Sequence, residues 1–75
     1  MSTPEANAAE TLRHVVINHR DYSSEKLLEA IRSLGKNKTQ IAAETLHHIV
    51  INTREYSDVE VTAAIKALGD ISSGR

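Results

Sequence analysis

Residues 8–35 read AAETLRHVVINHRDYSSEKLLEAIRSLG, and residues 42–69 read AAETLHHIVINTREYSDVEVTAAIKALG. The two segments align without a gap at an offset of 34 positions, and 16 of the 28 aligned residues are identical. A fixed period of this length is typical of a supersecondary unit that buries its apolar face against a neighbouring copy. We therefore expect one short structural unit that occurs twice.

Each copy has the pattern of a helical hairpin. In the first copy Leu12, Val15 and Val16 continue an apolar stripe that Ala8 and Ala9 begin, with the spacing of one helix face. The predicted fold is all-α, with two tandem 34-residue helical hairpins in a compact four-helix domain. Its predicted helices cover residues 4–20, 24–34, 40–54 and 58–68, and the single domain of residues 1–75 divides into a first repeat (4–35), a connector (36–39), a second repeat (40–69) and a flexible tail (70–75).

Capping residues support these boundaries. Thr3 is expected to cap the first helix and Ser23 the second, and Ser57 with Glu60 fits a capping box. Gly35, like Gly69 in the second copy, stands where a helix commonly ends in a left-handed residue. The caps predict that each hairpin turn lies just before the second helix of its copy.

Two tyrosines precede the caps of the second and fourth predicted helices. Tyr22 lies five residues before Leu27, and Tyr56 lies five residues before Val61. This spacing is that of a hydrophobic staple, which sets the angle at which the chain enters a helix. The less favoured interpretation is that either tyrosine takes part in a chemical reaction.

The helical stripes also predict the core. The most buried side chains are expected to be Leu12, Val16, Ile31, Leu34, Leu46, Val50, Ile65 and Leu68. An alternative reads residues 14–18 and 48–52 as short buried strands of a βαβα fold, because both runs are rich in β-branched residues. Helices are favoured, since the sequence AAETL leads into each run without a turn residue.

The composition argues against several classes of protein. Nine Lys and Arg balance ten Asp and Glu, so no overall field draws the chain to nucleic acid or to an anionic membrane. The longest apolar runs, such as residues 15–17, are far shorter than a membrane span. Without cysteine or signal-peptide features at the start, the chain is expected to be soluble and cytoplasmic.

Metal binding, cofactor binding and catalysis are not expected. His14 and His19 are five residues apart and His47 and His48 are adjacent, whereas two ligands on one helix face stand three or four apart. No glycine-rich phosphate loop is present, and a hairpin pair of 75 residues has little room for a ligand pocket. We therefore expect no enzyme activity.

His14 with Asn18 recurs as His48 with Asn52, four residues apart on each long helix. Two interpretations remain open for these pairs. In the first, they form hydrogen bonds on the helix surface or are simply retained from the ancestral unit; in the second, they belong to a recognition face that is present twice.

Ile17 and Ile51 lie outside the main stripe, yet both copies keep isoleucine. We expect these side chains to be partly exposed and covered by another subunit, with a homodimer as the commonest closed arrangement. The leading hypothesis is a small interaction module, a regulator, inhibitor or adaptor that binds a partner protein. Its expected partner-binding residues are Ile17, Asn18, Tyr22, Ile51, Asn52 and Tyr56.

A nucleic-acid-binding regulator is the alternative hypothesis. It would use the basic residues Arg13, Arg20, Arg54, Arg32, Lys36 and Lys38. The two similar hairpins contain no distinct basic recognition helix, which makes this alternative the weaker of the two.

Overall fold

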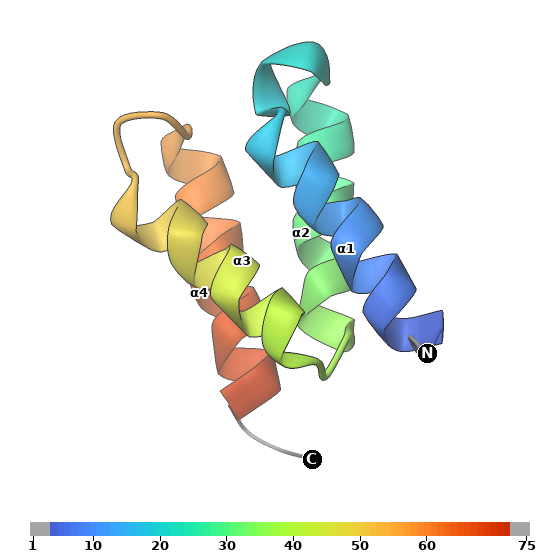
Figure 1. The fold of residues 1–75 in the computed structure, drawn as a ribbon. Helices are drawn as coiled ribbons and strands as arrows, with labels where there is room; N and C mark the ends of the chain where they lie inside the picture. The colour runs from blue at the N-terminus through green and yellow to red at the C-terminus, as the bar shows by residue number, and fades with distance from the viewer. Residues whose placement is uncertain (1–3, 73–75) are drawn as a thin grey trace.

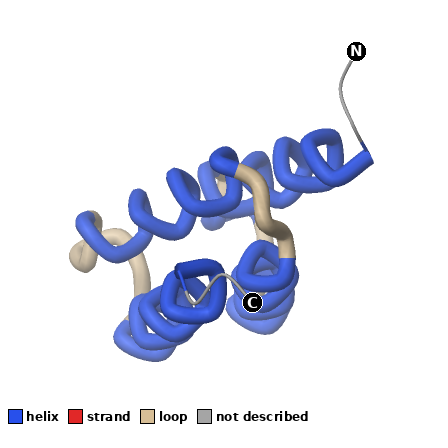
Figure 2. Tube along the Cα trace, turned by 90° about the horizontal axis from the view of Figure 1, so that it is seen from below, coloured by secondary structure: helices blue, strands red, loops and turns tan. Residues whose placement is uncertain are grey.

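The computed structural model describes residues 4–72 and contains four α-helices and one short 3-10 helix. The elements are α1 (Pro4–Ile17), η1 (His19–Asp21), α2 (Ser24–Lys36), α3 (Gln40–Ile51) and α4 (Asp58–Ser72). Figure 2 shows only helices and connecting loops over the described part of the chain. The all-α prediction is confirmed, and the βαβα alternative is wrong for these residues.

The four helices lie in two layers. Figure 1 shows α1 and α3 in front of α2 and α4, with the α1–α2 and α3–α4 connections at the same end of the molecule. The most extensive interhelical contact is between α2 and α4, and α1 packs against both α2 and α3. This arrangement encloses one core between the layers.

The front helices, α1 and α3, end earlier than predicted. They stop at Ile17 and Ile51, three residues before the expected ends. At each end an asparagine side chain donates to the carbonyl four residues back, from Asn18 at 2.9 Å and from Asn52 at 2.7 Å. A side chain that bonds to the last turn competes with continuation of the helix.

Two of the three predicted N-terminal caps are present. The Ser23 Oγ accepts the Lys26 N–H at 3.2 Å. In the capping box the Ser57 Oγ accepts the Glu60 N–H at 3.2 Å, and the Glu60 carboxylate accepts the Ser57 N–H at 2.9 Å. The third cap, at Thr3, lies outside the described residues.

The glycines do not end helices as predicted. Gly35 lies inside α2 and Gly69 inside α4, which extends through residues 70–72 of the expected tail. A Cβ at Gly35 would lie 2.9 Å from the Ala67 Cβ and 3.2 Å from the Ala67 Cα. Gly35 is therefore present because α2 and α4 pack closely, and its backbone remains helical.

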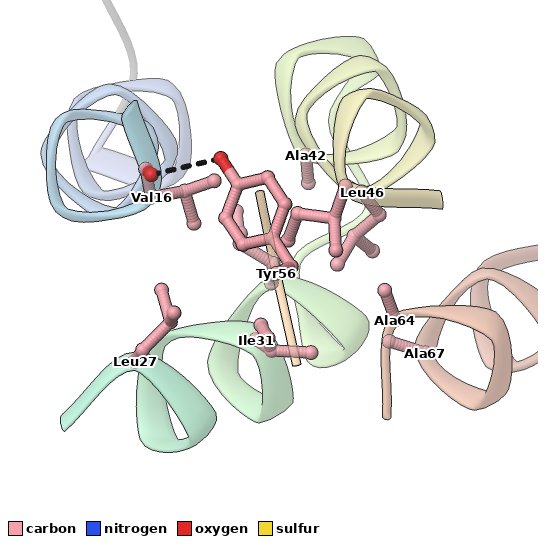
Figure 3. Close-up of a cluster of buried hydrophobic side chains, with 10 residues drawn as sticks. Val16, Leu27, Ile31, Ala42, Leu46, Tyr56, Ala64 and Ala67 are labelled. Atoms are coloured by element: carbon pink, nitrogen blue, oxygen red, sulfur yellow. Dashed lines mark hydrogen bonds between the residues drawn. The ribbon is translucent and has the colours of Figure 1, made fainter. Parts of the chain in front are cut away.

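The core is aliphatic apart from one tyrosine. Of the predicted residues, Val16, Ile31, Leu34 and Leu46 have no exposed surface, and Leu12, Val50 and Leu68 pack at the edge of the core. The prediction for Ile65 is wrong, because its side chain is 55% exposed. Ile49, Leu27 and Tyr56 are buried in addition (Figure 3 labels Leu27 and Tyr56).

Candidate protein-interaction site

Both isoleucines outside the main stripe are exposed, Ile17 by 47% and Ile51 by 62%. Ile51 follows the buried Ile49 by two residues, which turns its side chain about 200° around α3, away from the core. Ile17 follows the buried Val16 by one residue, so it lies beside the covered face of α1. The expected partial exposure of the two side chains is confirmed.

Ile17 and Ile51 have different surroundings. Ile17 lines a shallow hollow of about 200 Å³ between α1 and α3, together with Arg13, Glu44, Thr45 and His48. Ile51 does not line this hollow. The structure therefore places Ile17 at the seam between the front helices, and Ile51 on the side of α3 turned away from the core.

The predicted asparagines take part in helix termination. Besides its bond to the His14 carbonyl, the Asn18 Nδ2 lies 3.3 Å from the His14 Nδ1. Asn52 repeats both contacts with His48, the ring contact again at 3.3 Å. An amide nitrogen donates, so a bond to Nδ1 requires a neutral ring with its proton on Nε2. Of the two interpretations of these pairs, the hydrogen-bonded one is confirmed, and both asparagines remain partly exposed.

The two tyrosines occupy different environments. Tyr56 is only 5% exposed, and its hydroxyl donates to the Val16 carbonyl at 3.0 Å (Figure 3). Tyr22, at the corresponding position of the first copy, is partly exposed. Tyr56 thus belongs to the core and joins the second hairpin turn to α1, and of the two tyrosines only Tyr22 offers surface to a partner.

Several contacts surround the buried Tyr56. The His19 ring lies against it with centroids 4.5 Å apart, and the His48 ring meets it edge-on at 6.1 Å. The His19 Nε2 also lies 3.6 Å from a Glu55 carboxylate oxygen. Burial, followed by the nearby carboxylates of Glu55 and Glu60, raises the pKa of Tyr56.

A further link, between α2 and α4, passes through Glu60. This side chain is 7% exposed, and its Oε2 accepts the Ser24 hydroxyl at 2.8 Å while Oε1 completes the capping box. The capping box was detectable from residue spacing. The bond to Ser24 was not, because it joins residues that are 36 positions apart in the chain.

The basic residues of the alternative hypothesis are dispersed. Arg32 and Lys36 line a hollow of about 360 Å³ between α2 and α4, together with Lys66 and Asp70. Arg32 also pairs with Glu29 at 3.0 Å. Arg13 lines the hollow between α1 and α3, Arg20 lines another beside η1, and Lys38 and Arg54 lie in connections between helices.

Among residues 4–72, no group of three or more histidine, aspartate and glutamate side chains is arranged to hold a metal ion. None of the helices in the same range combines the length and the hydropathy needed to cross a bilayer.

Comparisons of the chain with models of protein families, with curated proteins and with solved structures found no match.

Proposed function

We propose that this chain is a small protein-interaction module without enzymatic activity, acting as a regulator, inhibitor or adaptor by binding a partner protein. The observation that supports it best is the exposure of large apolar side chains on an otherwise closed fold. Ile17, Ile51, Val59 and Ile65 are between 47% and 62% exposed. Where exposed apolar side chains form a contiguous patch, that patch commonly marks an interface with another protein.

We further propose that the module consists of two tandem helical hairpins. Three correspondences at the 34-residue offset support this architecture. Helices α1 and α3 end at the equivalent residues Ile17 and Ile51, and helices α2 and α4 begin at the equivalent residues Ser24 and Asp58. The hydrogen bond from an asparagine side chain to the carbonyl four residues back is also present at the ends of both α1 and α3. Such units normally bury their apolar faces against neighbours, and two units have few neighbours within the chain.

Self-association and a cytoplasmic location complete the proposal. A single core in a chain this short supplies only about 3 to 5 kcal/mol of stability, so covering exposed isoleucines with a second subunit would add to it. The absence of cysteine from the 75 residues suits a reducing compartment, where disulfides do not contribute to stability.

The test of partner binding is capture from a lysate of the native host. The parent chain and the double variant Ile17→Glu, Ile51→Glu are immobilised in parallel. The matched control is Ser33→Glu, which adds a charge at another exposed position. A host protein retained by the parent and the control, and lost from the double variant, supports the proposal. No retained protein, or equal retention by all three with unchanged helical circular dichroism, contradicts it.

The nucleic-acid alternative is supported by one feature, the three cations Arg32, Lys36 and Lys66 around a single hollow. Fluorescence anisotropy, which measures binding of the chain to a DNA duplex and to single-stranded RNA, distinguishes the two proposed functions. Binding through phosphates weakens steeply as salt rises, because condensed counterions are released. Tight binding with that salt dependence, lost in Arg32→Gln with Lys66→Gln, would favour the alternative over the interaction module.

A further inference from the structure

Residues that are identical in the two copies differ in burial. Val16 and Ile31 in the first copy have no exposed surface. Their equivalents 34 positions later, Val50 and Ile65, are partly exposed and 55% exposed. The amino acid is the same at each position, so the difference arises from what lies beside it.

The equivalent glycines show the same difference. A Cβ at Gly35 would collide with Ala67 of α4, whereas a Cβ at Gly69 would meet nothing within 4 Å. Gly35 allows α4 to approach α2 closely, and Gly69 would allow the same close approach on α4, where no helix within residues 4–72 contacts it.

The reason for these differences is the position of each hairpin in the stack. The second hairpin covers one side of the first, and no part of residues 4–72 covers the corresponding side of the second. We call this uncovered side the end face. Its apolar part consists of Ala43, Val50 and Ile51 on α3 with Ile65 and Gly69 on α4, and the exposed His47, the equivalent of Arg13, lies beside Ala43 and Ile51 on the same face of α3.

The opposite end of the molecule has a different character. On α4 the surface against α2 includes Glu60, Ala63 and Ala67, which are buried or partly buried. The equivalent residues on α2 are Lys26, Glu29 and Ser33, all three exposed. Polar residues at the outer side of a terminal repeat are the usual way in which a stack of repeats is closed.

This asymmetry determines how two copies can meet. Head-to-tail stacking would place the end face of one copy against Lys26 and Glu29 of the next, and would remove these charged groups from water against a face that offers them no charged partner. Contact between two end faces brings these five uncharged residues of each copy together, and it closes after two copies.

We propose that two copies of this chain associate through their end faces around a two-fold axis. The inference rests on the proposed architecture of two stacked hairpins, and it assigns the dimer contact to Ile51, Ile65 and Gly69 rather than to Ile17. A stable interface buries about 800 Å² on each partner. The total accessible surface of the chain is 5113 Å², so one end of the four-helix stack must provide about a sixth of it.

Sedimentation velocity tests the contact. The parent is expected to shift from monomer to dimer as its concentration rises to tens of micromolar. Ile65→Glu should remain monomeric with an unchanged helical circular dichroism spectrum, because the wild-type side chain is already exposed. The matched control Ile17→Glu makes the same substitution at the α1–α3 seam, and it should dimerise like the parent.

Cross-linking tests the symmetry, because the chain has no cysteine and each introduced thiol is the only one. A short bismaleimide should join two copies of Ile65→Cys and should not join two copies of Glu29→Cys. A mixed product of Ile65→Cys with Glu29→Cys would show head-to-tail stacking and overturn the two-fold arrangement.

A parent chain that stays monomeric at tens of micromolar overturns the dimer proposal. It leaves the interaction module intact if the lysate experiment still retains a host protein, and capture that Ile65→Glu abolishes would assign the end face to that other protein. A dimer that Ile17→Glu disrupts as strongly as Ile65→Glu also overturns the assignment.

Discussion

Gly35→Ala is expected to destabilise the chain, although the same change favours most helices. The added Cβ would lie 2.9 Å from the Ala67 Cβ and 3.2 Å from the Ala67 Cα. An alanine Cβ cannot rotate away, so α2 and α4 must separate. Overpacking of this kind lowers the free energy of unfolding by about 1 to 3 kcal/mol. The higher helix propensity of alanine offsets about 0.5 to 1 kcal/mol of that loss. The two ranges together give an expected net loss of up to about 2.5 kcal/mol, centred near 1 kcal/mol.

The assay is thermal and urea denaturation followed by circular dichroism. For a domain of this size each kcal/mol corresponds to a fall of roughly 4 to 8 °C in Tm. Gly69→Ala is the matched control, because it makes the same change at the equivalent position, where no atom lies within 4 Å. At low micromolar concentration, where the proposed dimer is expected to be dissociated, this control should gain about 0.5 to 1 kcal/mol.

A double-mutant cycle isolates the collision. Ala67→Gly removes the methyl group that the new Cβ would meet, so Gly35→Ala should cost less in that background than in the parent. If Gly35→Ala is as stable as the parent, or if its cost is unchanged by Ala67→Gly, the close packing of α2 on α4 does not explain this glycine.

Further substitutions test the core and the helix ends by the same denaturation assay. Leu46→Ala should cost roughly 2 to 5 kcal/mol because the side chain is fully buried, and a melting curve that overlays the parent's would show that the core is misassigned. Ser57→Ala should cost about 1 kcal/mol through the lost cap, and Asn52→Ala about 0.5 to 1.5 kcal/mol through the lost bond to the His48 carbonyl, whereas exposed Thr53→Ala should change little. Tyr56→Phe should cost about 1 to 3 kcal/mol at neutral pH, because the buried Val16 carbonyl loses its donor. The raised pKa of Tyr56 favours the neutral phenol in the folded state, so this contribution is complete below about pH 10 and is lost as pH rises through the folded-state pKa. Urea midpoints measured from neutral to strongly alkaline pH should therefore fall more for the parent than for Tyr56→Phe, and parallel curves would contradict the assignment.

Local sequence signals predicted the parts of the fold that depend on neighbouring residues. The Ser23 cap and the Ser57–Glu60 capping box span three residues each, and both are present. The ends of α1 and α3 were predicted too late because the apolar stripe was extended through Asn18 and Asn52. The signal at those ends was available, since asparagine often bonds to the backbone in preference to continuing a helix.

The functions of Gly35 and Tyr56 could not be predicted from local signals. Each depends on an atom far away in the chain, the Ala67 Cβ for Gly35 and the Val16 carbonyl for Tyr56. The staple spacing described the neighbours of Tyr56 and gave no indication of the bond to α1. The same spacing at Tyr22 leaves a partly exposed side chain, so the motif alone does not distinguish the two tyrosines.

The exposure of Ile65 shows how a repeated sequence misleads a prediction of burial. Ile31 and Ile65 are identical residues in equivalent positions, and treating the copies as equivalent predicted both to be buried. In the proposed stack of two hairpins the two ends differ, so the copies are equivalent only on sides that are covered in both. The signal lay in the positions where the copies differ: Glu29 and Ser33 became Ala63 and Ala67, and this change from polar to small apolar residues marks the side of α4 that packs against α2. The other side of α4, which carries Ile65, is the side that a single chain leaves open.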